Sequence, residues 1–377
     1  MSVSSKPAFD FALYESLEKA ALIERVQRVR QAMGPRLLIL GHHYQQDDVI
    51  ALSDLRGDSF GLSEKAAAAE NCEAIVFCGV HFMAETADIL ANRPERLAAR
   101  GFRRVPVVLP DPEAGCSLAE MADIAQVERC WEELAALLDV SDLMPITYVN
   151  SSAALKAFCG RQGGIVCTSS NAGPALQWAF QRRSRVLFFP DQHLGRNTAK
   201  AQGIPLEQMV LWNPRQHPYG GNPPEMIRRS RVILWNGFCC VHQVFLPEHI
   251  LRLRKAIPGI KIVVHPECMM EVADLADEVG STSKIIRVVE DSSPGTRWAI
   301  GTEPHLVKRL RAQHPDKDIR LLSPTARICD TMFRISLPRL CWAVENLAAG
   351  APVGVVEVVP EIVDGALLAL GRMLEVR

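Results

Sequence analysis

Short runs of aliphatic and β-branched residues recur along the whole chain, and stretches with helical periodicity separate them. Runs of this kind are typical of strands buried on both faces of a parallel sheet. Nine of them predict strands: LLIL (37–40), AIVFC (74–78), VPVVL (105–109), ITYV (146–149), RVLFF (185–189), RVILW (231–235), KIVVH (261–265), WAIG (298–301) and IRLL (319–322). Because strand and helix alternate, the pattern predicts an α/β fold.

The segment after the seventh run shows the helical periodicity most clearly. Its apolar residues follow the i, i+3, i+4, i+7 spacing of one helix face; they are Val272, Leu275, Ala276 and Val279. This spacing predicts a helix that extends to Val279.

The nine runs form three groups of three, and the loops after corresponding runs carry similar residues. A polar cluster follows the first run of each group: GHHYQ (41–45), YVNSS (148–152) and VHPE (264–267). A hydroxyl-rich motif comes next: GDS (57–59), TSS (168–170) and GSTS (280–283). The second runs lead to GVHFMAET (79–86), PDQHLG (190–195) and GTEP (301–304), and the third to loops with Cys116, Cys239 and Cys329. One order of features, found three times, indicates a degenerate triplication.

The repeat predicts three homologous α/β/α units, with parallel sheets arranged about a pseudo-threefold axis. We expect an N-terminal helical segment at 1–34, repeats at 35–143, 144–258 and 259–347, and a C-terminal tail at 348–377. Ligands of open α/β sheets bind beyond the carboxyl ends of the strands. The motif loops lie at these ends, so the sequence predicts one active site at the centre of the three units.

The cysteines suggest what this site contains. The chain has 11 cysteines, an odd number, and its N-terminus has no signal-peptide pattern, so we expect a cytoplasmic protein without a disulfide framework. Three thiolates can hold a [4Fe–4S] cluster and leave one iron open as a Lewis acid. None of the usual ferredoxin spacings is present. Only equivalent placement in the repeat distinguishes Cys116, Cys239 and Cys329, with Cys240 and Cys341 as alternatives.

Charge and hydropathy limit the classes of molecule that the protein is expected to bind. Lys and Arg number 42 against 43 Asp and Glu, which gives a net charge of −1. A nucleic-acid or membrane-surface partner would require a basic patch. No apolar run reaches the roughly 18–20 residues that span a bilayer. These features favour small molecules as substrates.

Together the motifs resemble those of the quinolinate synthase family, over most of the chain from about Arg36 to Leu347. The most specific are GVHFMAETADIL, TYVNSSAALKA, PDQHLGRNTA, WNGFCCVHQ and VHPECMMEVADLADEVGSTSKII. The resemblance implies condensation of iminoaspartate (iminosuccinate) with dihydroxyacetone phosphate, giving quinolinate, phosphate and two waters for de novo NAD synthesis. An aspartate oxidase that makes iminoaspartate is a candidate partner.

The resemblance also implies the cluster and its ligands. An oxygen-sensitive [4Fe–4S] cluster would bind three cysteines that match Cys116, Cys239 and Cys329. Some members of the family carry C-x-x-C-x-x-C around the third ligand, whereas Met332 follows Cys329 here. Cys341 therefore has to be tested as an alternative to Cys329 as the third ligand.

Four residues match catalytic positions of the family. His42 and Tyr44 suit proton transfer to and from the triose carbonyl and hydroxyl groups, and His43 competes with His42. Glu267 is the predicted general base, and His265 would bind or polarise a substrate oxygen. A Glu just before a helix is otherwise explained as a cap that the helix dipole favours.

The remaining matches are substrate-binding positions. Tyr148 and Asn150 would orient the substrate, and Phe82 would form a wall of the cavity. Hydroxyls beside helix N-termini can hold substrate carboxylates, and helix capping is their other explanation; these hydroxyls belong to Ser59, Ser169, Ser281 and Thr282. His193 and His242 receive no role from the sequence.

Three other functions are compatible with parts of the pattern. A different [4Fe–4S]-dependent hydro-lyase would dehydrate a hydroxy acid and would not need the triose phosphate. Cys, His and Glu could instead hold zinc for hydrolysis. A non-enzymatic iron–sulfur sensor is the least favoured, because it has no use for the HHY, YVN and HPE motifs.

Overall fold

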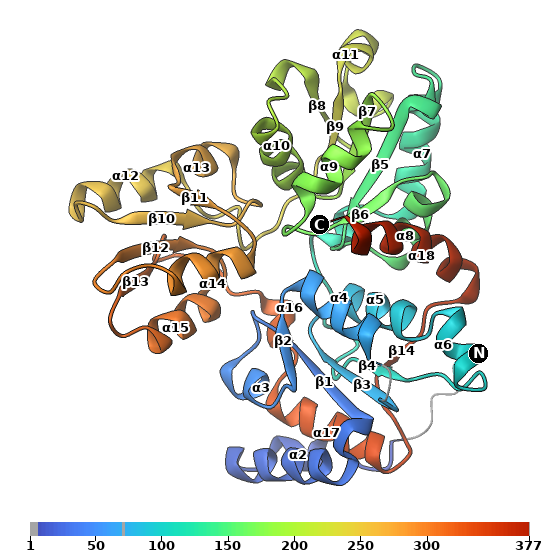
Figure 1. The fold of residues 1–377 in the computed structure, drawn as a ribbon, viewed down its shortest axis with the longest axis vertical. Coiled ribbons are helices and arrows are strands. Elements are labelled where there is room, and N and C mark those ends of the chain that lie inside the picture. The colour runs from blue at the N-terminus through green and yellow to red at the C-terminus, as the bar shows by residue number, and fades with distance from the viewer. Residues whose placement is uncertain (1–6, 70–71, 377) are drawn as a thin grey trace. The chain divides into compact units, whose positions relative to one another are not determined.

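The structure is a computed structural model that describes residues 7–69 and 72–376. It has three separate sheets, each flanked by helices, and all nine predicted strands are present (Figure 1). The chain divides into two compact units. The first unit extends to Cys116 and includes Cys329–Val363, and the second contains Ser117–Ile328 and the segment from Asp364.

The first unit contains one sheet, with the strand order β14-β4-β3-β1-β2. All its pairs are parallel except that between β14 and β4. Its strands are β1 (Leu37–His42), β2 (Leu55–Gly57), β3 (Ala74–Cys78), β4 (Val107–Val108) and β14 (Val355–Val356). Its helices are α1 (Ala12–Glu15), α2 (Lys19–Met33), η1 (Gly34–Arg36), α3 (Asp47–Ala51), α4 (Ser59–Ala68), α5 (His81–Ala91), α6 (Pro94–Ala99), α16 (Asp330–Phe333) and α17 (Leu337–Ala348).

The second unit contains two sheets, with the orders β6-β5-β7-β9-β8 and β11-β10-β12-β13. The strands of the first are β5 (Leu143–Tyr148), β6 (Ile165–Cys167), β7 (Arg185–Phe189), β8 (Met209–Trp212) and β9 (Val232–Trp235). Those of the second are β10 (Lys261–Val264), β11 (Glu278–Val279), β12 (Arg297–Gly301) and β13 (Asp318–Leu321).

Helices connect and flank these strands of the second unit. They are η2 (Ala119–Met121), α7 (Ile124–Ala135), η3 (Val140–Asp142), α8 (Ala153–Arg161), α9 (Ala172–Phe180), α10 (Gln192–Ala201), η4 (Leu206–Gln208), η5 (Tyr219–Gly221), α11 (Pro224–Arg229), α12 (Pro247–Ala256), α13 (Met270–Leu275), α14 (Thr282–Glu290), α15 (Pro304–Gln313) and α18 (Pro360–Glu375).

The three sheets share one strand order. Each contains a predicted group of three strands in the order third, second, first, followed by a short strand that the sequence did not predict. The short strands are β2, β6 and β11, which pair parallel with β1, β5 and β10. In each sheet the short strand leads into the hydroxyl-rich motif and then into α4, α9 or α14. The strands β8 and β14 were also not predicted.

The prediction of a helix that extends to Val279 is wrong for the second half of that helix. α13 ends at Leu275, and Val279 belongs to β11. The chain leaves the helix because it pairs with β10: Asp277 N donates to Ile262 O at 2.9 Å, and Ile262 N donates to Asp277 Oδ2 at 2.7 Å. Tertiary pairing therefore outweighs the local helical spacing.

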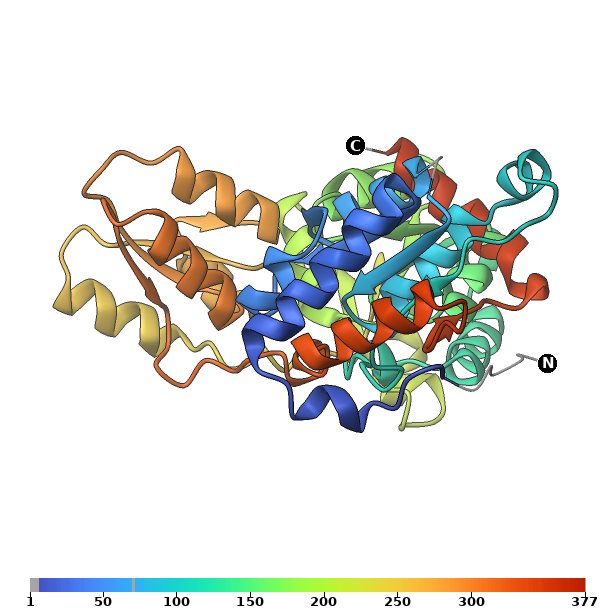
Figure 2. The same cartoon turned by 90° about the horizontal axis from the view of Figure 1, so that it is seen from below.

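Helices from both ends of the sequence complete the first unit. Figure 2 shows α2 and α17 side by side. Glu345 of α17 accepts hydrogen bonds from Tyr14 Oη at 2.5 Å and from Arg25 Nε at 2.9 Å. The segment 337–348 is thus joined to the N-terminal helices.

The C-terminal helix α18 packs closely on α8 in the second unit. A Cβ atom on Gly160 of α8 would lie 1.8 Å from the carbonyl oxygen of Gly365 of α18, so the backbones approach only because both residues are glycine. Arg372 donates to the carbonyl of Gly164 at 2.5 Å.

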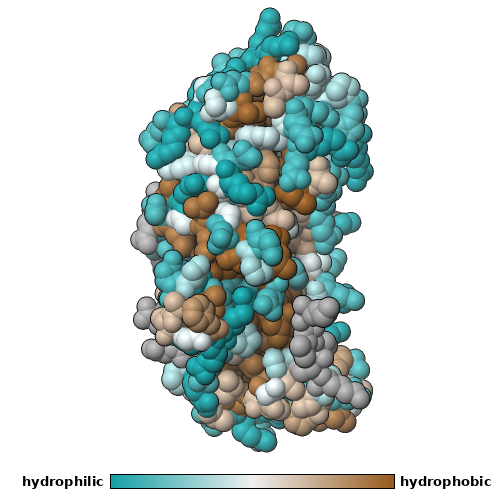
Figure 3. Space-filling view, turned by 90° about the vertical axis from the view of Figure 1, so that its right-hand side faces the viewer, coloured by the Kyte–Doolittle hydropathy of each residue, from teal (hydrophilic) through white to brown (hydrophobic). Residues whose placement is uncertain are grey.

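Hydrophilic side chains cover most of the face in Figure 3, and hydrophobic residues show between them. Among the described residues, none of the helices has both the length and the apolar character needed to cross a membrane.

Candidate active site

Glu267 is an ionisable group in the interior of the second unit. It lies in the loop after β10, and only 2% of it is exposed. Burial raises the pKa of this carboxyl, but the imidazoles of His265 and His242 and hydrogen bonds from His242 and Tyr148 outweigh burial and hold the pKa well below its usual range. Glu267 is therefore a buried carboxylate that stays ionised.

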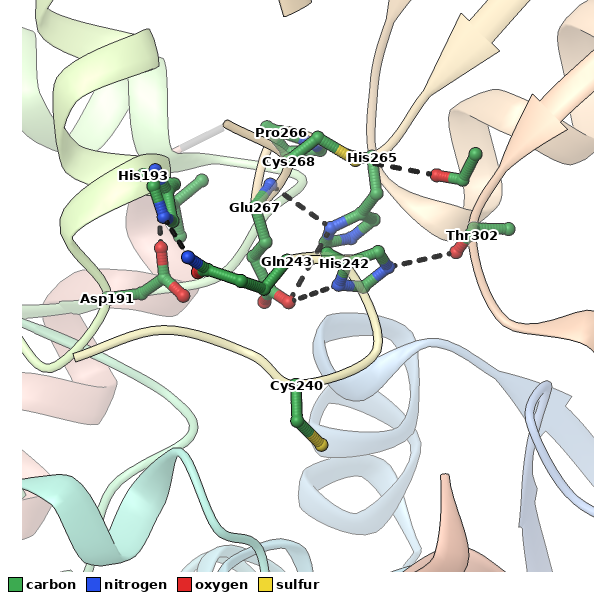
Figure 4. Close-up of polar contacts among 12 residues, drawn as sticks. Asp191, His193, Cys240, His242, Gln243, His265, Pro266, Glu267, Cys268 and Thr302 are labelled. Atoms are coloured by element: carbon green, nitrogen blue, oxygen red, sulfur yellow. Dashed lines mark hydrogen bonds and ion pairs between the residues drawn. The ribbon is translucent and has the colours of Figure 1, made fainter. Parts of the chain in front are cut away.

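Two histidines make this environment (Figure 4). Nδ1 of His242 lies 2.7 Å from Oε2 of Glu267, and Nδ1 of His265 lies 3.7 Å from the same oxygen. The two imidazole rings are stacked, with centroids 4.2 Å apart and planes at 12°. Nε2 of His242 lies 3.1 Å from the hydroxyl of Thr302, so both ring nitrogens of His242 have partners.

The loop geometry excludes the capping explanation for Glu267. Helix α13 begins at Met270 with Met269 as its N-cap, and no side chain caps it. A residue of another helix stabilises the loop instead: the side chain of Asn197 of α10 donates to the carbonyls of Pro266 and Cys268, both at 2.8 Å.

Asp191 is a second buried carboxyl, at the end of β7. Burial and the nearby Glu267 carboxylate raise the pKa of Asp191 well above its usual range. Asp191 caps α10, since its Oδ1 accepts from Leu194 N at 2.7 Å. The environment thus separates the pKa values of the two acids, as in sites that use one carboxylate and one neutral acid.

Tyr148 and Asn150 lie at the carboxyl end of β5. Tyr148 is buried and donates a hydrogen bond to Glu267. The amide oxygen of Asn150 is buried and has no hydrogen-bond partner among the described residues. An acceptor of this kind suits a ligand donor, because an unsatisfied buried polar group is costly.

Among the predicted hydroxyl groups, Ser281 is a helix cap. Its side chain accepts from Lys284 N at 3.3 Å at the start of α14. Ser59 and Thr282 are the first residues of α4 and α14, and the N-cap of α4 is Asp58. Capping therefore does not explain Ser59 or Thr282.

Ser169 lies in the turn between β6 and α9. Asn171 shapes this turn, because its Oδ1 accepts from Thr168 N at 2.8 Å and lies 3.1 Å from the Thr168 hydroxyl. Ser169 is half-buried and precedes the N-cap of α9, Asn171, by two residues. Capping is therefore no explanation for Ser169 either.

In the first unit, His42 and Tyr44 lie at the carboxyl end of β1. Their rings meet edge to face at 4.8 Å, and Nδ1 of His42 accepts from Tyr44 N at 3.2 Å. Gln45 is fully buried and donates to the carbonyl of Met332 at 3.0 Å. This bond joins the His42 loop to α16, whose N-cap is Cys329. Phe82, in the first turn of α5, is also buried.

Arg334 connects the two cysteine segments of the first unit. Its Nε donates to Asp111 Oδ2 at 3.0 Å, and its guanidinium also pairs with Glu113. Asp111 and Glu113 precede Cys116, and Arg334 follows Cys329. The loops that carry Cys116 and Cys329 are thus tied together within this unit.

Burial separates the eleven cysteines into two sets, and none of them forms a disulfide in the described chain. Burial raises the pKa of seven thiols: Cys72, Cys78, Cys130, Cys159, Cys167, Cys268 and Cys341. The thiolate is the form that binds metal, so these positions are disfavoured as ligands. The four half-buried cysteines are Cys116, Cys239, Cys240 and Cys329.

The family of the chain follows from comparison with known proteins. The model of the quinolinate synthetase A protein family matches residues 24–375. The chain belongs to the quinolinate synthase family. A quinolinate synthase of Rhodopirellula baltica is 58% identical over 364 residues, which cover 97% of this chain and 93% of that protein. Those of a Nocardioides species and Acidobacterium capsulatum are 51% and 49% identical, covering 94% and 100% of this chain and 89% and 98% of theirs.

The family predicted from the motifs is therefore confirmed, and the zinc hydrolase and the sensor lose their basis as descriptions of this chain. Within the second unit, the structure brings together three of the predicted site residues, Tyr148, His265 and Glu267. Sequence reasoning assigned no role to His242 or Asp191. The C-x-x-H spacing from Cys239 to His242 could have identified His242, and the PDQ motif after the second strand contains Asp191.

Proposed function

We propose that the protein condenses iminoaspartate with dihydroxyacetone phosphate to quinolinate, releasing phosphate and two waters, in de novo NAD biosynthesis. The buried, ionised Glu267 is the observation that carries this proposal beyond family membership. C–C bond formation and dehydration both require removal of protons from carbon, and a positioned carboxylate can accept them. His242, through its 2.7 Å contact, fixes the orientation of that carboxylate.

The other side chains of the proposed site bind and orient the substrates. Tyr148 and Asn150 orient the substrate, and His265 polarises a substrate oxygen. The hydroxyls of Ser59, Ser169 and Thr282 hold carboxylates with nearby backbone N–H groups, and Ser281 supports Thr282 by capping α14. His42 and Tyr44 move protons at the triose carbonyl and hydroxyl groups, and Phe82 forms an apolar wall.

Cys116, Cys239 and Cys329 would hold the [4Fe–4S] cluster. Their half-buried thiols fit this role, whereas burial raises the pKa of the alternative thiol Cys341 to about 12. When bound, a cluster with three protein ligands supplies an open iron that acts as a Lewis acid on a substrate oxygen. Cys240 stays the closest alternative, because it is half-buried and adjacent to Cys239.

We also propose that the three sheets are related by a pseudo-threefold axis with the site at its centre. The shared strand order and the equivalent positions of the motifs support repeats at 35–143, 144–258 and 259–347, with an N-terminal segment at 1–34 and a tail at 348–377. A cytoplasmic location and an aspartate oxidase partner remain predictions from the sequence.

Product identity tests the proposed function. The protein is purified without oxygen, its iron and sulfide are reconstituted, and iminoaspartate is generated in situ from aspartate by an oxidase. With dihydroxyacetone phosphate, we expect one quinolinate per phosphate released. A protein with an intact cluster that dehydrates a hydroxy acid but makes no quinolinate would instead be the alternative hydro-lyase.

A further inference from the structure

Three metal-binding side chains of different types meet inside the second unit: Cys239, His242 and Glu267. One ligand atom from each lies within 4.8 Å of the others. Cys239 and His242 belong to one turn after β9, in which His242 N donates to Cys239 O at 3.2 Å and Gln243 N donates to the same oxygen at 3.0 Å. Glu267 comes to this turn from the loop after β10 (Figure 4).

This set of atoms suits a borderline divalent metal ion. Sulfur, imidazole nitrogen and carboxylate oxygen are the ligands of zinc sites, and three protein ligands with one open position are usual where zinc also binds water or substrate. A thiolate and a carboxylate together balance the charge of a divalent ion. Binding needs only small side-chain movements, since tetrahedral ligand atoms lie about 3.3–3.8 Å apart at normal zinc distances.

The surroundings of His242 prepare its Nδ1 atom for a metal. Without a metal, Nδ1–H of His242 donates to Oε2 of Glu267 at 2.7 Å, and Nε2 lies 3.1 Å from the hydroxyl of Thr302. A divalent ion would replace the Nδ1 proton beside the carboxylate, while Nε2–H donates to Thr302. A hydrogen bond from the second ring nitrogen is also how proteins usually orient a histidine that binds metal.

We propose that Cys239, His242 and Glu267 form a mononuclear site for a divalent metal ion such as Zn²⁺ or Fe²⁺ in protein that lacks its iron–sulfur cluster. All three ligands belong to one compact unit, so the site does not depend on the other proposed cluster cysteines. It takes up Cys239 and Glu267, so it competes with cluster assembly and blocks the proposed base. The metal site itself does not rest on the proposed function.

Cobalt binding tests the site directly. The full-length chain, freed of cluster and metal, is titrated with Co²⁺, whose thiolate charge-transfer and tetrahedral d–d absorptions report the ligands, and Zn²⁺ is then added as competitor. We expect one Co²⁺ per chain with both absorptions, and displacement by Zn²⁺. Cys239→Ala should abolish the charge-transfer band, and Glu267→Gln and His242→Ala should weaken binding at least tenfold.

Matched variants separate this site from other thiols and from misfolding. Cys240→Ala changes the neighbouring thiol, and Cys116→Ala and Cys329→Ala change the other proposed cluster ligands; all three should bind Co²⁺ as the parent does. Thr302→Val is nearly isosteric and keeps every ligand, yet should weaken binding about 10–100-fold because the imidazole loses its orienting partner. Binding that is lost in Cys116→Ala, or unchanged in both His242→Ala and Thr302→Val, overturns the proposal.

Discussion

Glu267 owes its chemistry to its neighbours. Burial alone would make this carboxyl neutral, and two imidazoles and the Tyr148 hydroxyl reverse that effect. The sequence could predict that Glu267 and His265 are together, because only one proline separates them. It could not predict the orientation by His242, which lies 25 residues away in sequence.

Substitution of Glu267 should abolish the chemistry and leave the fold intact. Glu267→Gln keeps the shape but removes the base, so we expect quinolinate formation to fall by about 10²–10⁴-fold. The matched control is Glu271→Gln, an exposed glutamate at the start of α13 in the same segment, which should behave as the parent does. Near-parental turnover in Glu267→Gln would exclude Glu267 as the base.

Substitution of His242 should shift the pH dependence of the reaction. The pKa of Glu267 is depressed, so its basic form is present above that low pKa. His242→Asn keeps one N–H donor but loses the imidazole charge, so burial is opposed less and the pKa rises. Between pH 4 and 8 the parent should show no acid limb of kcat/KM from Glu267, whereas in His242→Asn the limb should move up into this range. An unchanged acid limb would show that His242 does not act through Glu267.

At the scale of elements, contacts between distant segments hold the substrate-binding turns. Asn171 shapes the Ser169 turn with Oδ1, while its Nδ2 donates to the carbonyls of Met373 at 3.2 Å and Val376 at 3.0 Å. The C-terminal helix is therefore part of the support of the proposed carboxylate site. This connection spans more than 200 residues, so no local pattern could predict it.

Asn171→Ala should weaken substrate binding more than turnover. Loss of the amide frees the Ser169 turn from α18, and we expect KM for iminoaspartate to rise about tenfold, equivalent to about 1.4 kcal/mol, with kcat nearly unchanged. Steady-state kinetics at saturating dihydroxyacetone phosphate measures both constants. A fall in kcat at constant KM would contradict this role.

The close packing of α8 against α18 predicts that a larger residue at the contact lowers the stability of the fold. Gly160→Ala places a methyl group against the Gly365 carbonyl, and we expect a loss of about 1–3 kcal/mol, seen as a lower denaturant midpoint. Gly371→Ala is the control on α18, because a Cβ there meets nothing within 4 Å. Alanine favours helix, so this variant should be as stable as the parent or more so. Equal midpoints for the two variants would show that the crossing tolerates the methyl group.

A strand can be predicted from the sequence when its own residues carry the pattern of a strand. Eight of the nine predicted strands lie inside their sheets, and β13 lies at an edge; their runs of apolar residues reveal them. The strands β2, β6 and β11 have two or three residues each, and β2 exposes Leu55 and Arg56. β6 is apolar but has only three residues, whereas β2 and β11 have no apolar run and form because a neighbouring strand pairs with them.

For the whole molecule, the sequence predicted three groups of strands and the family, and both are confirmed. The proposed triplication rests on motif order, because loops after corresponding strands carry similar residues. The sequence did not predict that α16, α17 and β14, from the end of the chain, belong to the same compact unit as its beginning. Contacts such as Gln45 with Met332 decide that, and they are visible only in three dimensions.

One cysteine from each proposed repeat serves, in our proposal, a single quinolinate-forming site. The most direct measurement is anaerobic quinolinate formation, with iron and sulfide content, in alanine variants of five cysteines. We expect Cys116→Ala, Cys239→Ala and Cys329→Ala to lose both the cluster and quinolinate formation, and Cys240→Ala and Cys341→Ala to keep both. Full activity in any of the first three, or loss of the cluster in Cys341→Ala but not in Cys329→Ala, would contradict it.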